Sequence, residues 1–177
     1  MHTIEILNLI ISAIMAFAIV FAGIQININR KQLYLSTITK CVSDFRNLGE
    51  INRQTTDSLI INRYIDLTNE ELFYFQHNYI PKIIMKEWID GMIDFIPITN
   101  KKGQILNKKY CIEFIADQRS IIFQNFPRIQ NAFEINKTFN VELIYSTEEE
   151  KRIDKVKERE RLIKEILIKI RGFNWFD

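Results

Sequence analysis

The sequence predicts a mainly α-helical protein, with one N-terminal transmembrane helix followed by a small cytosolic helical bundle. Two observations carry this prediction. Residues 6–24 form an uncharged apolar run, and apolar side chains recur every three or four residues through much of the remaining chain. The composition agrees, because 47% of the 177 residues are hydrophobic and only 5 are Gly and 3 are Pro. Such a composition excludes collagen-like, low-complexity and disordered chains.

The apolar run at residues 6–24 reads ILNLIISAIMAFAIVFAGI. A helix of this length covers about 28 Å, close to the ~30 Å hydrocarbon core of a bilayer. A cleaved signal peptide and a buried core helix are the alternatives. A signal peptide would have basic residues before the run, where the chain reads MHTIE, and a core helix of a small domain would have a polar face. We therefore favour an uncleaved anchor over residues 1–29, with residues 30–177 as the cytosolic domain.

The flanking charges predict the orientation of this anchor. Arg30, Lys31, Lys40 and Arg46 follow the apolar run, and no Lys or Arg precedes it. The positive-inside rule then places the N-terminus outside and the C-terminal domain in the cytoplasm. After residue 29 the chain carries 24 basic and 21 acidic residues, a net charge of +3. This is far below the charge density of a nucleic-acid-binding domain, so we expect no nucleic-acid partner.

Helical periodicity continues beyond the anchor. A stripe of apolar residues covers residues 35–48. The pattern Thr68-x-x-Glu71 is a capping box and predicts that a helix begins at Thr68. Pro81 is expected at the first position of the next helix, which continues up to Pro97. Residues 68–96 are therefore expected to form two packed helices joined by a turn.

The following segment is expected to contain a loop and less regular structure. Residues 97–109 (PITNKKGQILNKK) predict the clearest loop. Residues 110–125 resume a helical pattern, which Pro127 ends. Residues 128–145 permit a short strand, but helix or irregular structure is favoured because a strand without a partner is not stable.

The last predicted element is a charged amphipathic helix. Ser146-x-x-Glu149 is a second capping box, and Gly172 is a natural stop. An apolar seam begins with Ile153 and Val156. Packing of this seam against the other helices is favoured over self-association.

The chain lacks the common catalytic motifs. It contains no G-x-S-x-G, no G-x-x-x-x-G-K-[ST], no G-x-G-x-x-G, no H-E-x-x-H and no C-x-x-C pattern. Cys41 and Cys111 each lie in an apolar helical pattern and are expected to be reduced and partly buried. His77 is expected to be structural or exposed. We therefore predict a non-enzymatic protein with no cofactor and no metal.

Two charged surfaces have alternative interpretations. Glu87, Asp90 and Asp94 share one helix face, which is either a solvated surface or a site for a basic partner or a divalent cation. Several basic residues could contact lipid headgroups, although an exposed solvated loop is the plainer interpretation for most of them. These candidate headgroup residues are Arg30, Lys31, Lys101, Lys102, Lys108 and Lys109.

One stretch of the sequence resembles a known kind of protein. The aromatic and acidic segment DLTNEELFYFQHNYIPKIIMKEWIDGM at residues 66–92, placed after a single span, resembles small bacterial single-span proteins assigned to domains of unknown function. Some of these occur beside phage-defence genes. The resemblance implies a bacterial inner membrane as the location, and it transfers no catalytic residue.

These observations predict a membrane-anchored, non-enzymatic interaction or regulatory module. Its expected partners are the lipid bilayer and either a protein or a second copy of the chain. The alternative is an oligomerising membrane effector in stress or phage defence. The candidate partner-binding residues are large and aromatic: Phe173, Trp175, Phe176, Trp88 and Tyr79.

Overall fold

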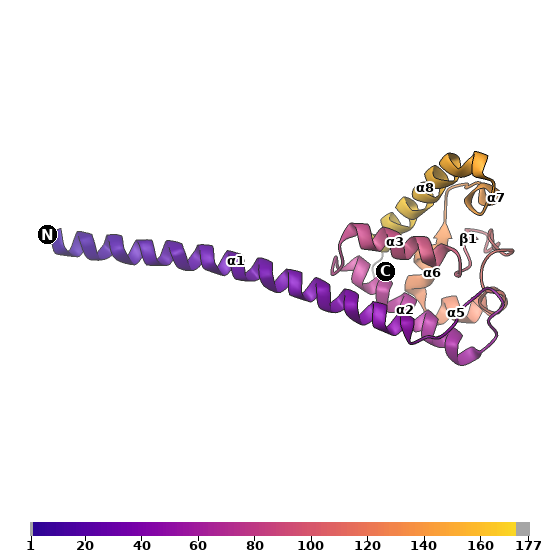
Figure 1. The fold of residues 1–177 in the computed structure, drawn as a ribbon, viewed down its shortest axis with the longest axis horizontal. Helices are drawn as coiled ribbons and strands as arrows, with labels where there is room; N and C mark the ends of the chain where they lie inside the picture. Colours follow the sequence, from indigo (N-terminus) through magenta and orange to yellow (C-terminus); the bar gives the residue numbers. More distant parts are fainter. Residues whose placement is uncertain (1, 173–177) are drawn as a thin grey trace. The chain divides into compact units, whose positions relative to one another are not determined.

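The computed structural model describes residues 2–172 and confirms the mainly α-helical fold (Figure 1). Within this range the chain forms eight α-helices, one short 3₁₀ helix and two strands of two residues each. Contacts divide the chain into two compact units, Met1–Thr39 and Lys40–Asp177. The boundary lies inside the first helix, and each unit is described by itself.

The first unit consists of the N-terminal part of helix α1, which runs from His2 to Arg46. None of the residues in its most apolar window is buried, and side chains such as Phe17 and Ile19 are about three-quarters exposed. The core-helix alternative is therefore wrong. The helix is long and apolar enough to cross a membrane.

The second unit begins with the last two turns of α1 and continues through seven further α-helices. Helices α2, α3 and α8 are its longest complete helices, and shorter elements from the middle of the chain lie beside them (Figure 1). The bounds are α2 Ser58–Gln76, α3 Lys82–Ile93, β1 Thr99–Asn100, α4 Glu113–Asp117, α5 Arg119–Asn125, α6 Pro127–Phe133, β2 Glu134–Ile135, α7 Val141–Ile144, the 3₁₀ helix Glu149–Lys151 and α8 Arg152–Arg171.

The start of α2 corrects the first predicted capping box. The helix begins ten residues earlier than predicted, where the Asp57 carboxylate accepts a hydrogen bond from the backbone N–H of Leu59 at 2.8 Å. Thr68 therefore lies in the middle of α2, and its hydroxyl is buried without a hydrogen-bond partner among the residues described. Glu71 is likewise a mid-helix residue rather than a cap.

Pro81 stands immediately before α3, one position earlier than predicted, and α3 ends at Ile93 rather than continuing to Pro97. The buried side chain of Asn107 holds the turn that follows. Its carbonyl oxygen accepts from the N–H of Ile98 at 2.7 Å, and its amide donates to the carbonyl of Ile96 at 3.0 Å.

The region between the loop and α8 is more broken than predicted. The helical pattern over residues 110–125 forms two short helices, α4 and α5, that meet at Gln118. Pro127 ends this pattern as predicted, and it also begins α6. The segment 128–145 forms mostly helix and irregular structure, as favoured, in α6, α7 and their connections. A strand of two residues, β2, also forms in it and pairs in parallel with β1, a distant partner that no local pattern reveals.

Helix α8 starts later than its predicted capping box. The Ser146 hydroxyl accepts from the N–H of Glu148 at 3.2 Å, which makes a local turn before the 3₁₀ helix. The seam is buried only in its second half, since Ile153 and Val156 are more than half exposed. The buried residues of α8 are Leu162, Ile163, Glu165, Ile166 and Ile170, and they pack α8 against α2, α3, α6 and α7.

Candidate functional site

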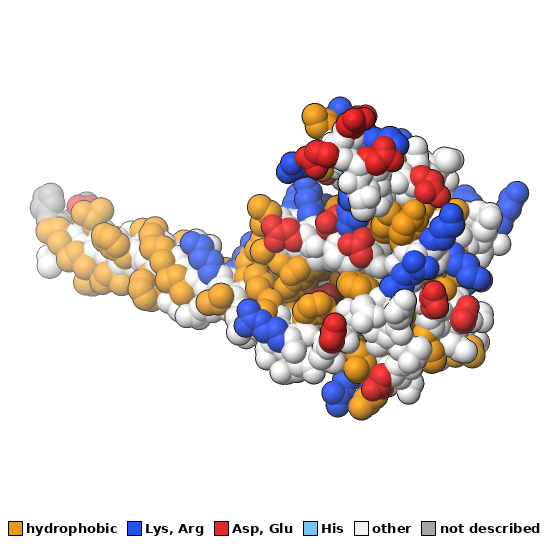
Figure 2. All heavy atoms as spheres, turned by 45° about the vertical axis from the view of Figure 1, so that its right-hand side comes forward, with side chains coloured by type: hydrophobic (Ala, Val, Ile, Leu, Met, Phe, Trp, Pro, Cys, Tyr) orange, Lys and Arg blue, Asp and Glu red, His pale blue; other side chains and the backbone are white. Residues whose placement is uncertain are grey.

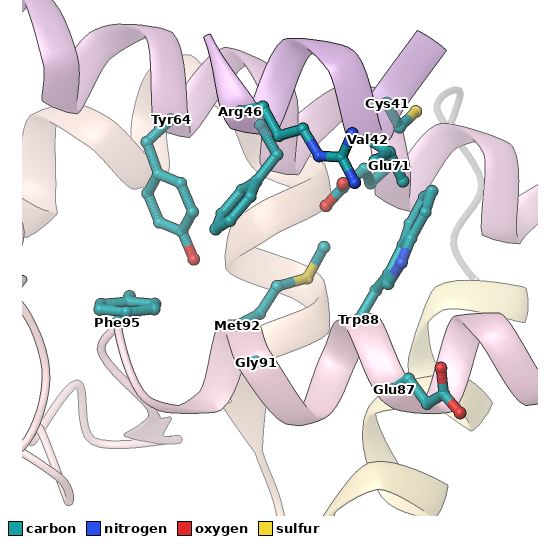
Figure 3. A pocket seen from close by; sticks show the side chains of 11 residues that line it. Cys41, Val42, Arg46, Tyr64, Glu71, Glu87, Trp88, Gly91, Met92 and Phe95 are labelled. Carbon is teal, nitrogen blue, oxygen red and sulfur yellow. The ribbon is translucent and has the colours of Figure 1, made fainter. Parts of the chain in front are cut away.

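The second unit contains an apolar groove of about 270 Å³. It lies between the last turns of α1 and helices α2 and α3, and side chains from all three point into it (Figure 3). Figure 2 shows hydrophobic side chains gathered around a hollow on the face of the molecule turned toward the viewer. The side chains used below are Cys41, Val42, Phe45 and Arg46 of α1, Tyr64 and Glu71 of α2, and Glu87, Trp88, Gly91, Met92 and Phe95 from α3 and the turn after it.

Aromatic contacts fix the spacing between α2 and α3. The ring of Phe75 meets Trp88 with centroids 6.1 Å apart, and the ring of Tyr64 meets Phe95 edge-on at 5.7 Å. Such pairs contribute about 0.5–1.5 kcal/mol each beyond the area that they bury. Because Phe75 and Tyr64 lie far apart on α2, the two contacts hold α2 and the α3 region together at both ends of the groove.

Two adjacent carboxylates of α2 have opposite environments. Glu70 accepts hydrogen bonds from Lys40 at 2.6 Å and from the Tyr74 hydroxyl. Burial raises the pKa of the Glu70 carboxyl, but these two hydrogen bonds lower it more, and the net pKa lies below the ordinary value. Glu70 is therefore an ionised and well-compensated group.

Glu71 is only 9% exposed, and no residue between 2 and 172 gives its carboxylate a hydrogen bond or ion pair. Burial raises its pKa to about 8, with a further contribution from the negative charge of Glu70. The carboxyl faces the apolar groove (Figure 3). A buried acid without a partner is costly, so its presence in a groove wall makes this groove the leading candidate site.

Cys41 lines the same groove but has the properties of an inert thiol. Its side chain is buried and reduced, and burial raises its pKa to about 12. Cys111 is also buried and reduced, and burial raises its pKa to about 11. Because the thiolate is the reactive form, neither residue is suited to nucleophilic chemistry near neutral pH.

Among the predicted partner-binding residues, the structure places Trp88 in the groove and Tyr79 elsewhere. Tyr79 is 38% exposed and follows α2. Its ring lies 5.7 Å from that of His77, which in turn lies 4.4 Å from Phe73. His77 is exposed at the C-terminal end of α2. The other three candidates, Phe173, Trp175 and Phe176, lie outside the described residues.

The predicted headgroup residues are spread over both units and are all exposed. Arg30 and Lys31 belong to the first unit, whereas Lys101, Lys102, Lys108 and Lys109 belong to the second. The Lys109 ammonium group lies 4.0 Å from the Glu142 carboxylate. Because both side chains are exposed, this ion pair contributes little to stability.

The acidic face of α3 has an intramolecular partner. Arg159 of α8 donates to Asp90 at 2.6 Å and to Asp94 at 3.0 Å, and it also donates to the backbone carbonyl of Asp90. The basic partner that the sequence allowed is thus a residue of this chain. In residues 2–172 no group of three or more His, Cys, Asp or Glu side chains is arranged to hold a metal ion.

Sequence reasoning missed Glu71 as a site residue because it assigned the residue to a helix cap. The usable signal was its position seven residues after Tyr64 and four before Phe75, which places it on the buried face of one helix. No protein-family model matches this chain, and neither the curated proteins nor the solved structures contain a significant match.

Proposed function

We propose that this protein is a membrane-anchored, non-enzymatic interaction module at the cytoplasmic face of a bacterial inner membrane. In this proposal residues 6–24 span the bilayer with the N-terminus outside, and the helical domain binds a partner protein in the groove. The observation that carries the proposal is an open, aromatic-walled groove in a domain whose other large apolar side chains are mostly packed together. Contiguous exposed apolar surfaces of a folded domain mark protein-interaction or ligand-binding sites.

The groove has the composition of a binding surface. Phe45 at its mouth is 47% exposed, and Trp88 is half-buried beside the fully packed Met92. Aromatic residues and Met are enriched at the centres of protein interfaces, and the largest binding contributions come from a few such side chains. The absence of common catalytic motifs in the sequence supports the non-enzymatic part of the proposal.

Gly91 offers a matched pair of variants to test this function. A Cβ at Gly91 meets no heavy atom within 4 Å, so larger side chains can be introduced without a clash at that atom. Gly91→Phe should fill the groove, whereas Gly91→Ala adds one methyl group and serves as the control. Both changes favour the helix, because Gly is the poorer helix former by about 1 kcal/mol.

The test is affinity purification of the tagged full-length protein in mild detergent, with mass spectrometry and sizing of the eluate. We expect a defined protein that co-purifies with the wild type and with Gly91→Ala but is lost from Gly91→Phe. Equal recovery of the partner protein with both variants would show that the groove is not the contact surface. If truncation after Gly172 instead removes the partner, the contact lies in the aromatic C-terminal residues.

The same purification separates the module from the alternative effector. A lone homo-oligomer that Gly91→Phe leaves intact would favour an oligomerising effector in stress or phage defence, with conductance in liposomes as the next measurement. Orientation is tested with Thr3→Cys, because the native cysteines are buried. A membrane-impermeant maleimide should label Thr3→Cys in intact spheroplasts, and labelling only after lysis would reverse the proposed orientation.

A further inference from the structure

We infer that the groove recognises an ammonium group carried on an unbranched apolar stem, the chemistry that a lysine side chain of a partner protein presents. The inference rests on the proposed function, since it names what the partner inserts into the same groove. Three features carry it: a buried carboxylate without a partner, aromatic and aliphatic walls, and a size that suits one long side chain.

The carboxylate of Glu71 supplies the charge complementarity. The charged and titratable groups that face it come from three helices: Cys41 and Arg46 of α1, Tyr64 and Glu70 of α2, and Glu87 of α3. Glu70 is already compensated by Lys40, and Arg46 is an exposed residue with no ion pair to Glu71. Among the described residues Glu71 thus lacks a cation, and a partner ammonium group would supply it.

The walls of the groove suit the rest of such a ligand. Val42 and Met92 offer aliphatic surface for a hydrocarbon stem, and the rings of Trp88 and Phe95 stand beside the space that the stem would occupy (Figure 3). Lysine buries its methylene stem along apolar surface, and an ammonium group is attracted to the face of an aromatic ring. The walls and the carboxylate therefore favour the same ligand.

The size of the groove favours a single side chain over a larger molecule. Its volume of about 270 Å³ is close to the lower end of the roughly 300–1,000 Å³ of small-molecule clefts, so it accommodates one long side chain. A lipid amine carries a phosphate next to its ammonium group, and the groove lining holds two carboxylates, Glu71 and Glu87, against one guanidinium, Arg46, so its net negative charge disfavours that phosphate. A protein lysine brings the cation without this repulsion, so we assign the occupant to a protein.

The probe for this inference is butylammonium, which reproduces the lysine side chain, with 1-butanol as its neutral counterpart. Binding is followed by the fluorescence of Trp88 in full-length protein in neutral detergent at constant ionic strength. The substitution Trp175→Phe makes Trp88 the sole tryptophan, since the chain contains 2. We expect butylammonium to bind at least tenfold more tightly than 1-butanol.

Two carboxylate variants provide the matched comparison. Glu71→Gln should weaken butylammonium binding at least tenfold, whereas Glu87→Gln at the rim should change it less than twofold. Butylammonium affinity should rise from pH 6 to pH 8 in the wild type, because the cation requires the ionised carboxylate and burial raises the pKa of Glu71 to about 8. Glu71→Gln should abolish this rise. Thermal unfolding of each variant verifies that it is folded.

Equal binding of butylammonium and 1-butanol, or an unchanged affinity in Glu71→Gln, would overturn the inference. Tighter competition by phosphatidylethanolamine in nanodiscs than by butylammonium would also overturn it, by assigning the ammonium group to a lipid. A partner that is lost from Gly91→Phe but retained by Glu71→Gln would contradict lysine recognition while supporting the interaction module. The failures of the two proposals are therefore distinguishable.

Discussion

Adjacent glutamates on one helix turn experience opposite electrostatics because only one of them has a cation beside it. Glu70 is stabilised as a carboxylate by Lys40, whereas Glu71 is buried in an apolar wall. The hydrogen bond to Glu70 is the main cause of the raised pKa of Lys40, and burial opposes it. The contrast shows that side-chain partners, rather than position on the helix alone, determine the charge state.

Glu71 should make the protein less stable as the pH rises. Its pKa is about 8 in the fold against an ordinary value of 4.5, so between these values the native state holds a proton that the unfolded chain has lost. The cost grows through this window to at most roughly 5 kcal/mol above pH 8. Glu71→Gln should therefore stabilise the protein by a few kcal/mol at pH 8 and by much less at pH 5. Urea unfolding at several pH values measures this difference.

The exposed Glu87 on the same groove provides the control for that measurement. Glu87→Gln should leave the pH dependence of the unfolding free energy as in the wild type. If Glu71→Gln is no more stable than the wild type at pH 8, the charge of the Glu71 carboxylate must be stabilised by an interaction that the structure does not contain.

At the scale of elements, Arg159 is the main polar link between α8 and α3. Its side chain is 14% exposed, and it binds two carboxylates and one backbone carbonyl. Arg159→Met should destabilise the protein by about 1–3 kcal/mol, because charge-assisted hydrogen bonds of partly buried groups are lost. Chemical denaturation measures the effect. In an Asp90→Asn, Asp94→Asn background the same substitution should cost clearly less, and an equal cost would mean that Arg159 acts through packing alone.

Asn107 has a comparable role in the turn after α3. Its side chain is fully buried and satisfies backbone groups of Ile96 and Ile98. Asn107→Leu has a similar size but should cost roughly 2–4 kcal/mol, because it leaves buried backbone groups unpaired. The thermal unfolding midpoint measures the loss. Asn100→Leu, in the same region but partly exposed, is the comparison, and an equal loss in both variants would contradict this role.

The sequence predicted the helices of this unit better than their ends. The sequence located α3, α8 and the second half of α2, because the periodicity of a buried face extends over several turns. The capping patterns at Thr68 and Ser146 were misleading, since a three-residue spacing also occurs inside a helix or in a local turn. The β1–β2 pair joins Thr99 to Glu134, and no local pattern encodes such a contact.

The candidate site was predictable only in part for the same reason. Trp88 was recognisable as a large aromatic residue on a helix, but its neighbours in the groove come from α1 and α2 as well. Whether a glutamate lies at the surface or in a groove depends on which helices pack beside it. The burial of Glu71 in the groove wall therefore follows only from the packing of the three helices.

At the scale of the whole molecule, residues 6–24 should determine where the protein resides in the cell. Ile14→Lys together with Ala18→Lys places two charges in the centre of the apolar run, each costing about 3 kcal/mol on insertion scales. The double variant should be extracted from membranes by alkaline carbonate, whereas the wild type should remain. Ser36→Lys with Thr39→Lys adds the same charges beyond the run and should not release the protein. Release of both double variants would contradict an anchor confined to the apolar run.

The most direct test of the central claim is photo-crosslinking from the groove in living cells. A photoreactive amino acid replaces Phe45, which is 47% exposed at the mouth of the groove, or Ile83, which is 67% exposed on α3 and does not line it. We expect a discrete protein adduct in the membrane fraction from position 45 and none from position 83. No adduct from position 45, or the same adducts from both positions, would contradict a membrane-anchored module that binds its partner in this groove.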